Sequence, residues 1–368
     1  MKRIKDISCF IIIVGICIYV CISCHHKSDD GMYFNGEIHI VKDSVDDVEN
    51  VKLKPIVLKG ANYGWVAVYD SLMLFFNPKL PNHFYNVFNI DTGEEIGTFC
   101  NRGNGPNEVV SLGPVFQFFK EGNDLKTLLF APNEEKLLFW NVTKSIEQNE
   151  TVFERILPYE WRNKNGGACY HEIFFQNKDT LLAKVSSFPI SNEEATLPFY
   201  QKRTVDTNEC LISYSMYKQS IKNGEASIIP ESFFYSNDTF KPDGTKIVQV
   251  MTHFPQFNIM DVRTGKVVGY RLNEGTDFSV FERRQDIKWY FGNVQANDNY
   301  IYASYLGKKQ WEDVKIIYVF DWNGKLVRKL ATDYAIGKMW IDIVRNRLYT
   351  TEPITDEVFY LDLNELET

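Results

Sequence analysis

Short runs of aromatic and branched aliphatic residues recur along the chain and are separated by polar turns. Examples are LMLFF at 72–76, KLLFW at 136–140 and KIIYVF at 315–320. Such side chains fit the pleated, half-buried surface of a strand, and each run is too short for a typical buried helix. The best candidate for a helix, 278–289, has no continuous apolar stripe. The pattern therefore predicts an all-β protein.

Three stretches share one unit, an apolar strand, a polar turn with glycine and a second strand. They are VFNIDTGEEIGTF (87–99), NIMDVRTGKVVGY (258–270) and YVFDWNGKLVRKL (318–330). Asp, Asn and Gly stand in the turns, where the backbone needs a positive φ or a side chain that bonds its own backbone. Each stretch is predicted to be a hairpin.

Weaker copies of this unit occur at 137–156, 200–215 and 358–366, so that six units run along the chain. They recur at intervals of roughly 40 to 65 residues, at or above the range for propeller blades. The anchor positions are Ile90, Asn141, Asp206, Asp261, Asp321 and Asp362.

Six such units predict a six-bladed β-propeller of four-stranded antiparallel blades over residues 37–368. The last unit lacks an outer strand. The segment VKLKPIVL (51–58) is predicted to supply this strand and to close the ring, which leaves only short blade edges exposed.

Residues 1–23 are predicted to be a lipoprotein signal peptide. Three basic residues in the first five positions precede an uncharged apolar run over 7–22, short for a bilayer span of about 20 residues. The run ends in CISC (21–24), which resembles the lipobox of bacterial lipoproteins, with Cys21 in place of the usual Leu. The resemblance implies cleavage before Cys24 and lipidation of its thiol, and an uncleaved signal anchor is the alternative.

Residues 24–36 are predicted to be a polar tether. Its acidic pair, Asp29 and Asp30, resembles the export tag that directs lipoproteins to the cell surface in gut Gram-negative anaerobes. A plain soluble linker has the same composition and stays an open alternative. We expect a protein that is lipid-anchored in the outer membrane, and on the cell surface if the tag is genuine.

Net charge and cysteine usage exclude two other classes. The formal charge of −8 becomes −10 once residues 1–23 are removed, and no basic patch occurs, so nucleic acid is not an expected partner. Beyond Cys24 the mature chain keeps Cys100, Cys169 and Cys210, too few and too far apart for a disulfide framework or a metal motif. We expect three small buried side chains, with one bridge left open.

The signature motifs of the WD, kelch and sialidase propellers are missing from the sequence. The chain resembles the TolB-like six-bladed β-propeller lipoproteins of gut Gram-negative anaerobes, through the lipobox at Cys24, the hairpin FNIDTGEEIG (88–97) and the segment RGNGPNE (102–108). In that family the segment after the first hairpin reads Arg or Lys, Gly, x, Gly, Pro, x, Glu. The matching positions here are Arg102, Gly103, Gly105, Pro106 and Glu108.

This segment is predicted to be a stiff crossover from the outermost strand of one blade to the innermost strand of the next. Gly103 and Gly105 permit backbone angles that other residues avoid, and Pro106 fixes φ. Its glycine spacing lacks the Lys-Ser/Thr of a phosphate-binding loop.

Two interpretations of its polar residues remain open. In the structural one, Arg102 and Glu108 pair with each other or with neighbouring backbone and lock adjacent blades. In the functional one, Arg102, Asn104, Asn107 and Glu108 face a ligand at the mouth of the channel.

For function we expect a cell-envelope lipoprotein with a non-catalytic binding role through one propeller face, toward a glycan, a peptide or an envelope protein. Seven tryptophans would suit sugar stacking, although most are expected in the core. The alternative is a hydrolase or lyase that depends on a divalent cation, with Ca²⁺ held by Glu108, Asn293 and Asp298.

No catalytic residue or resident cofactor is predicted, because neither a Gly-x-Ser-x-Gly elbow nor a His-Glu-x-x-His helix occurs. A purely structural lipoprotein is the third option, since the architecture does not select a function.

Overall fold

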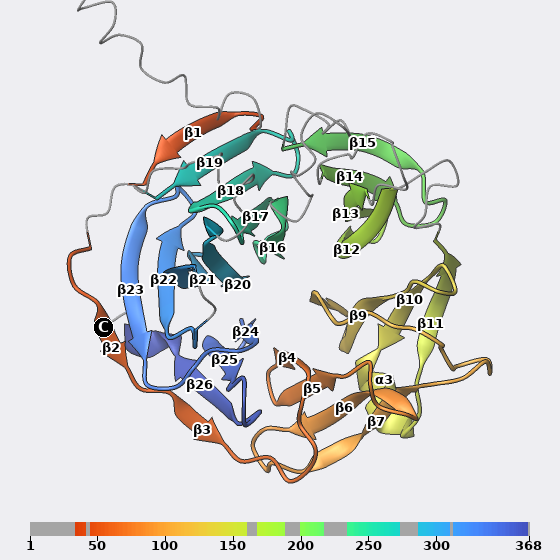
Figure 1. Cartoon of the computed structure of the whole chain (residues 1–368). Coiled ribbons are helices and arrows are strands. Elements are labelled where there is room, and N and C mark those ends of the chain that lie inside the picture. Colours follow the sequence, from red (N-terminus) through yellow and green to blue (C-terminus); the bar gives the residue numbers. More distant parts are fainter. Residues whose placement is uncertain are drawn as a thin grey trace, which may run out of the picture.

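The fold is a ring of six β-sheets around a central axis (Figure 1). The computed structural model describes residues 34–41, 45–159, 168–187, 199–216, 234–272, 286–309 and 312–366. Each sheet is built on a four-stranded antiparallel arrangement, and two sheets carry a fifth strand at one edge. The predicted six-bladed β-propeller is confirmed.

Blades one to three follow one another in the chain, and the strands of each are given from the axis outward. Blade one consists of β4 (Trp65–Tyr69), β5 (Leu72–Phe76), β6 (His83–Asn89) and β7 (Glu95–Asn101). Blade two consists of β8 (Phe118–Glu121), β9 (Asp124–Ala131), β10 (Lys136–Asn141) and β11 (Phe153–Pro158). Blade three consists of β12 (Ala168–Asn177), β13 (Thr180–Ser187), β14 (Phe199–Thr204) and β15 (Cys210–Ser215).

Blades four to six continue the ring in the same order. Blade four consists of β16 (Ser236–Phe240), β17 (Lys246–Met251), β18 (Gln256–Asp261) and β19 (Val267–Arg271). Blade five consists of β20 (Trp289–Ala296), β21 (Tyr300–Lys308), β22 (Ile316–Asp321) and β23 (Leu326–Thr332). Blade six begins with β24 (Met339–Asp342), β25 (Arg347–Thr351) and β26 (Val358–Asp362), and the short η4 (Leu363–Leu366) follows.

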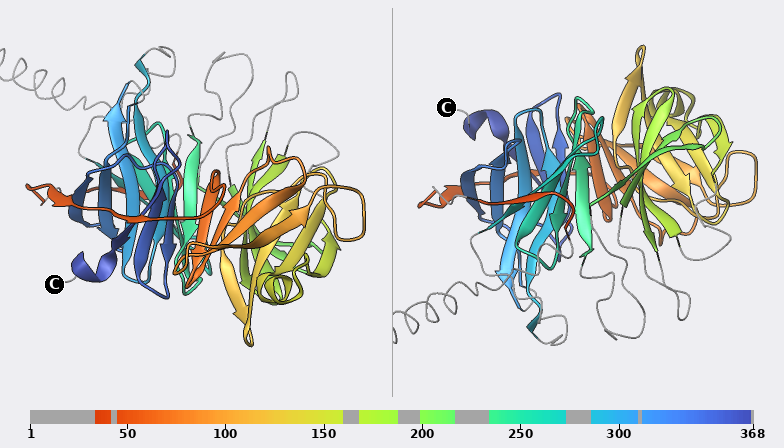
Figure 2. Two further views of the ribbon diagram at one scale, coloured as in Figure 1. Left: turned by 90° about the horizontal axis from the view of Figure 1, so that it is seen from below. Right: turned by 90° about the horizontal axis from the view of Figure 1, so that it is seen from above.

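The N-terminal segment lies along the outer edges of three blades (Figures 1 and 2). As predicted from 51–58, β3 (Lys54–Ile56) pairs antiparallel with β26 and completes blade six. Two further strands were not predicted: β1 (Glu37–Ile40) pairs in parallel with β19, and β2 (Glu49–Val51) pairs in parallel with β23. All three strands cover backbone groups that an outermost strand would otherwise leave unpaired.

The predicted hairpins are present as β6–β7, β18–β19 and β22–β23, and the weak copy at 200–215 is the pair β14–β15. The copy at 137–156 differs, because the helix α3 (Val142–Gln148) stands between β10 and β11. Asn141 caps this helix by accepting a hydrogen bond from the Lys144 amide at 2.9 Å. The candidate helix at 278–289 lies outside the described residues up to 285, and Trp289 begins strand β20.

Most of the described tryptophan side chains lie in the core, as expected, and one of them bonds to a neighbouring blade. Trp140, Trp322 and Trp340 are buried, and the indole of Trp340 in blade six donates to the Val68 carbonyl of blade one at 2.8 Å. Trp65 and Trp289 are exceptions, with exposed fractions of 44% and 36%. Trp161 and Trp311 lie outside the described residues.

The cysteines are only partly as expected. Cys100 is a buried free thiol, whereas Cys210 is free and exposed, so the prediction of burial is wrong for Cys210. Cys210 opens β15, the outermost strand of its blade, where side chains reach solvent. The side chain of Cys169 lies outside the described residues.

The predicted signal peptide, Cys24 and most of the tether fall before residue 34 and so lie outside the described residues. Within the described ranges, no helix combines the length and the apolar character that crossing a membrane requires.

Candidate ligand site at the channel mouth

The crossover after β7 is held by bonds to backbone. The guanidinium of Arg102 donates from Nε to the Leu80 carbonyl at 2.6 Å and from another nitrogen to the Pro78 carbonyl. It also stacks on the Phe84 ring, 3.9 Å from the ring centroid. Arg102 thus ties the connection between β7 and β8 to the connection between β5 and β6 within blade one.

Glu108 forms a hydrogen bond within the same crossover. Its carboxylate accepts a hydrogen bond from the Gly105 amide at 2.9 Å. Gly103 has a φ of +155°, and a Cβ atom there would lie 1.9 Å from the Glu108 carboxylate oxygen. Asn104 and Asn107 are exposed. These contacts are those of the structural interpretation, and a ligand-binding role for the four polar residues remains a prediction.

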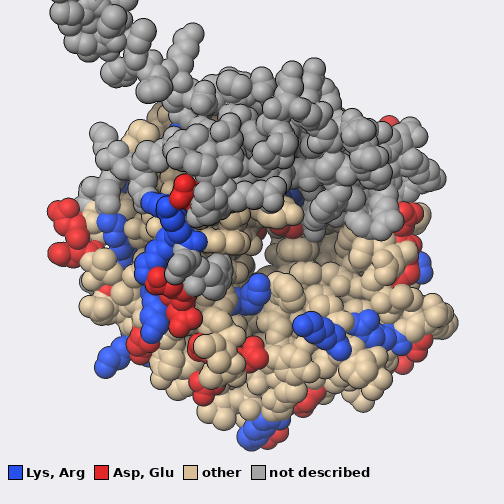
Figure 3. Space-filling view, viewed as in Figure 1, with Lys and Arg blue, Asp and Glu red and all other residues tan. Residues whose placement is uncertain are grey.

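The later part of this crossover reaches the central channel. Pro114, Val115 and Phe116 line a cavity of about 120 Å³ at the channel end where the innermost strands begin. The other lining residues come mainly from the innermost strands of blades one, three, four, five and six. Figure 3 shows an opening at the centre of the ring with Lys or Arg atoms at its rim.

One wall of the cavity carries a buried cluster of charged side chains. Lys184 on β13 lies between two carboxylates, with its Nζ 3.3 Å from Glu172 on β12 and 3.0 Å from Asp238 on β16. The side chains of Lys184, Glu172 and Asp238 are 7%, 16% and 0% exposed. The Tyr200 hydroxyl also donates to Asp238. We call Glu172, Lys184 and Asp238 the channel cluster.

The channel cluster is incompletely satisfied. Oε2 of Glu172 is buried and accepts no hydrogen bond from any residue that the structure describes. Oδ1 of Asp238 is also buried without a close donor, although the Gln249 side chain lies near enough to lower the pKa of this carboxyl by hydrogen bonding. A buried carboxylate oxygen without a donor costs free energy, so native proteins seldom retain one without a reason. Both residues line the cavity, but only the Glu172 side chain has exposed surface, so Glu172 is the carboxylate within reach of a ligand there.

The pKa values of the channel cluster reflect its excess of carboxylates over ammonium groups. Burial raises the pKa of Glu172 to about 7, although the Lys184 ammonium opposes this shift. Burial also raises the pKa of Asp238. Burial lowers the pKa of Lys184, but the two carboxylates outweigh it and leave that pKa above its ordinary value. One lysine therefore does not fully compensate two buried carboxylates.

A second lysine contributes to the cavity from blade six. Lys338 directly precedes β24, and its Nζ lies 4.6 Å from the centroid of the Trp65 ring. Burial lowers the pKa of Lys338. Within the described part of the chain, its ammonium has no carboxylate or carbonyl partner.

The predicted cation ligands are not brought together. Asn293 lines the cavity, but its side-chain amide donates to the Gly337 carbonyl at 2.6 Å. Asp298 lies in the turn after β20 and does not line the cavity. Glu108 bonds within its own crossover. Among the described residues no group of three His, Cys, Asp or Glu side chains is placed to hold a metal ion.

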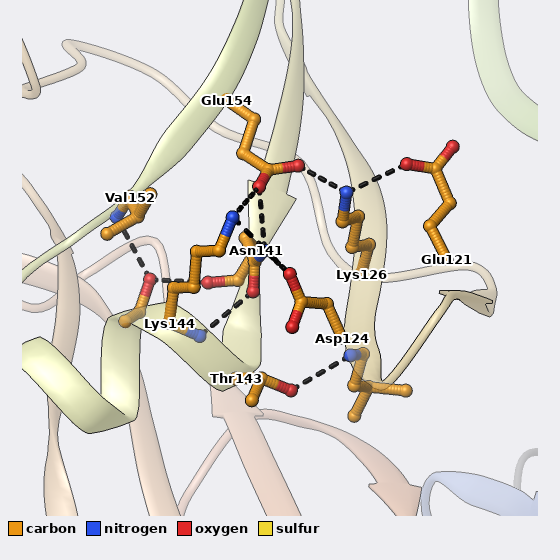
Figure 4. Close-up of polar contacts among 10 residues, drawn as sticks. Glu121, Asp124, Lys126, Asn141, Thr143, Lys144, Val152 and Glu154 are labelled. Carbon is orange, nitrogen blue, oxygen red and sulfur yellow. Dashed lines mark hydrogen bonds and ion pairs between the residues drawn. The ribbon is translucent and has the colours of Figure 1, made fainter.

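Blade two contains a different charged network, which is fully paired (Figure 4). Lys126 contacts Glu121 at 2.8 Å and also contacts Glu154. Lys144 contacts Glu154 at 2.6 Å, and the Asn141 amide bonds both Asp124 and Glu154. Burial alone would raise the pKa of Glu154, but its bonds to Lys126, Lys144 and Asn141 lower it to about 2. We call these six residues the blade-two network.

Sequence inspection missed the channel cluster. The one signal is Lys184, a charge within the apolar stretch TLLAKV (180–185) of a strand that is otherwise buried. A lysine is almost never fully buried without a partner, so this position indicates nearby carboxylates without identifying them.

No family model matches the chain, and no curated protein matches it. A crystal structure of a member of the DUF4221 family from Bacteroides vulgatus is similar, with a TM-score of 0.55 and 12% identity over 84% of this chain and 94% of that one. A putative exported protein from Bacteroides fragilis has a TM-score of 0.48 and 14% identity, covering 87% and 91% of the two chains. At 12% identity, the likeness to the Bacteroides vulgatus protein supports the propeller fold and nothing further.

Proposed function

We propose that this chain is an exported, lipid-anchored propeller that binds a small polar ligand, without catalysis, in the cavity at its channel mouth. The observation that carries the proposal is the carboxylate of Glu172 at the cavity wall, one oxygen of which is buried and accepts no hydrogen bond from described residues. Ligand pockets combine a concave, partly apolar wall with a few convergent polar groups, and this cavity has both.

The anchor belongs to the same proposal. The lipobox at Cys24 and the polar tether after it support attachment to the outer membrane, and Asp29 with Asp30 supports display on the cell surface. Membership of the TolB-like lipoproteins rests on these residues together with the RGNGPNE segment.

A ligand screen by thermal shift tests the binding role. Ligand that binds only the folded protein raises the melting temperature, so glycans, peptides and amino acids are compared at concentrations far above the expected Kd. A hit should lose its shift in Glu172→Gln and keep it in Glu121→Gln. The control makes the same substitution at a glutamate of an inner strand that also pairs with a lysine, away from the cavity. A shift that survives Glu172→Gln places binding elsewhere and contradicts the proposal.

The anchor has a separate test. Cells that express the chain are labelled with an alkyne fatty acid, and the membrane fraction is compared for the native chain and Cys24→Ala. We expect label only in the native chain and release of the variant from the membrane. Equal membrane retention without label would support the uncleaved signal anchor instead.

A further inference from the structure

The charges around the cavity are divided between two walls on opposite sides of the axis. Glu172 comes from blade three and Asp238 from the adjacent blade four, whereas Lys338 comes from blade six. In a ring of six, blades three and six face each other across the channel. All three residues line the one cavity, where the Glu172 side chain is 16% exposed and the Asp238 side chain is fully buried.

The ammonium of Lys184 has no donor to spare for the acidic wall. Besides the two carboxylates, Nζ of Lys184 contacts the hydroxyl of Ser236 at 2.9 Å and its carbonyl at 3.1 Å. An ammonium has three protons, so Lys184 has none left for the remaining carboxylate oxygens. With both carboxylates ionised, the channel cluster carries a net charge of about −1.

On the opposite wall, the ammonium of Lys338 lacks a hydrogen-bond acceptor among the described residues. Lys338 is partly desolvated and stacks on Trp65, while its three donors reach no acceptor on a described residue. A cation held this way is stabilised by the arrival of an anion.

We infer, on the basis of the proposed function, that the ligand is a zwitterion of the amino-acid or short-peptide class. Its ammonium group binds Glu172, next to the buried Asp238, and its carboxylate binds Lys338. An ammonium supplies both a donor for the Glu172 carboxylate and the positive charge that the channel cluster lacks, whereas a sugar hydroxyl supplies a donor but no charge.

A divalent cation fits the acidic wall less well. Ca²⁺ takes six to eight oxygen ligands, and the wall offers only the Glu172 carboxylate within reach, with the Lys184 ammonium beside it. The exposed ring of Trp65 adds an apolar surface next to Lys338, suited to the hydrocarbon part of a peptide or amino-acid side chain.

Calorimetric titration of the full chain in detergent tests this inference. The probes are alanine, dialanine and trialanine, together with N-acetyl-dialanine, dialanine amide and the neutral disaccharide cellobiose. The titrations run at pH 8, where Glu172 is ionised because its pKa is about 7. We expect at least one of the three zwitterions to bind, and loss of either terminal charge to weaken that binding at least tenfold.

Variants assign each charge to its wall. Glu172→Gln should weaken binding of the zwitterion at least tenfold and leave binding of N-acetyl-dialanine unchanged. Lys338→Met should also weaken binding of the zwitterion at least tenfold and leave binding of dialanine amide unchanged. Glu121→Gln is the matched control, and the melting temperature of each variant verifies folding. Equal binding of the capped and free peptides would overturn the inference.

Failure of the inference can be separated from failure of the proposed function. If cellobiose binds and the zwitterions do not, a channel-mouth site stands and its ligand class is wrong. If no probe of either series binds, the inference is overturned and the proposed function loses its support as well.

Discussion

Blades two and three are built alike around a buried lysine, yet their charged groups end in different states. In both blades a glutamate of the innermost strand, Glu121 or Glu172, contacts a lysine of the second strand, Lys126 or Lys184. In blade two, Asn141 and Lys144 supply further donors and every carboxylate is bonded. In the channel cluster the Tyr200 hydroxyl donates to Asp238, but Oε2 of Glu172 accepts no hydrogen bond from a described residue beside the cavity.

The comparison teaches that the number of charged residues does not indicate a site. The blade-two network holds three carboxylates and two lysines, so it carries the same net charge of about −1 as the channel cluster. Each of its carboxylates is bonded to a lysine or to Asn141, however, so the network stabilises the blade (Figure 4). In the channel cluster, the incompletely bonded buried carboxylates destabilise the folded protein, and natural proteins retain such destabilising groups mainly at functional sites.

The largest expected effect is that of Lys184→Met. The substitution leaves Glu172 and Asp238 buried without a counter-charge, which typically destabilises a protein by about 3–5 kcal/mol. Urea unfolding at pH 8 measures the loss. The loss should shrink toward pH 5, because the carboxylates then bind protons in the folded state. A loss below about 1 kcal/mol would mean that the cluster is not buried as described.

Glu154→Gln should destabilise the protein by about 1–2 kcal/mol at pH 7, because it weakens bonds to two lysines and one amide. The folded pKa of Glu154, about 2, lies below its ordinary value of 4.5. Its contribution is therefore complete above pH 4.5 and is lost as the pH falls from 4.5 to 2. Unfolding curves of both proteins over this range should converge at the acidic end.

Glu172→Gln should act in the opposite direction and stabilise the unliganded protein by about 1–3 kcal/mol at pH 8. The unfolded chain loses the proton near pH 4.5 and the folded chain keeps it to about pH 7. Native stability therefore falls as the pH rises through this window, and the neutral amide avoids that cost. The gain should vanish by pH 4.5, and a loss of melting temperature at pH 8 would contradict it.

The smallest expected effect is that of Glu108→Gln in the crossover after β7. An amide oxygen still accepts from Gly105, so we expect a change in stability below about 1 kcal/mol. Ligand-induced thermal shifts should stay as in the native protein. Loss of those shifts with an unchanged melting temperature would favour the recognition role of this loop.

The propeller could be predicted because each of its hairpins is marked by residues that are close together in the sequence. Turn residues such as Asp261 and Gly265 mark each hairpin directly in the sequence, and six copies at similar spacing imply a ring. The strands β1 and β2 were missed, since four and three residues are too few to show a period. The helix α3 was missed because seven residues form only two turns and follow a strand without a break.

The site was not predictable, because ring closure brings its parts together. Lys184 and Glu172 are near in sequence, but Asp238 joins them from the next blade and Lys338 faces them from the other side of the ring. No local pattern relates these positions. The RGNGPNE motif, which is local and conspicuous, is bonded mainly within its own crossover and the neighbouring connection.

The most direct measurement is a carbon NMR titration of the glutamate side-chain carboxylates in the unliganded protein, with Glu172→Gln and Glu154→Gln for assignment. We expect a pKa of about 7 for Glu172 and of about 2 for Glu154. A Glu172 that titrates at or below 4.5 would show that the channel cluster already has all its partners, and the claim of an open ligand site would fall.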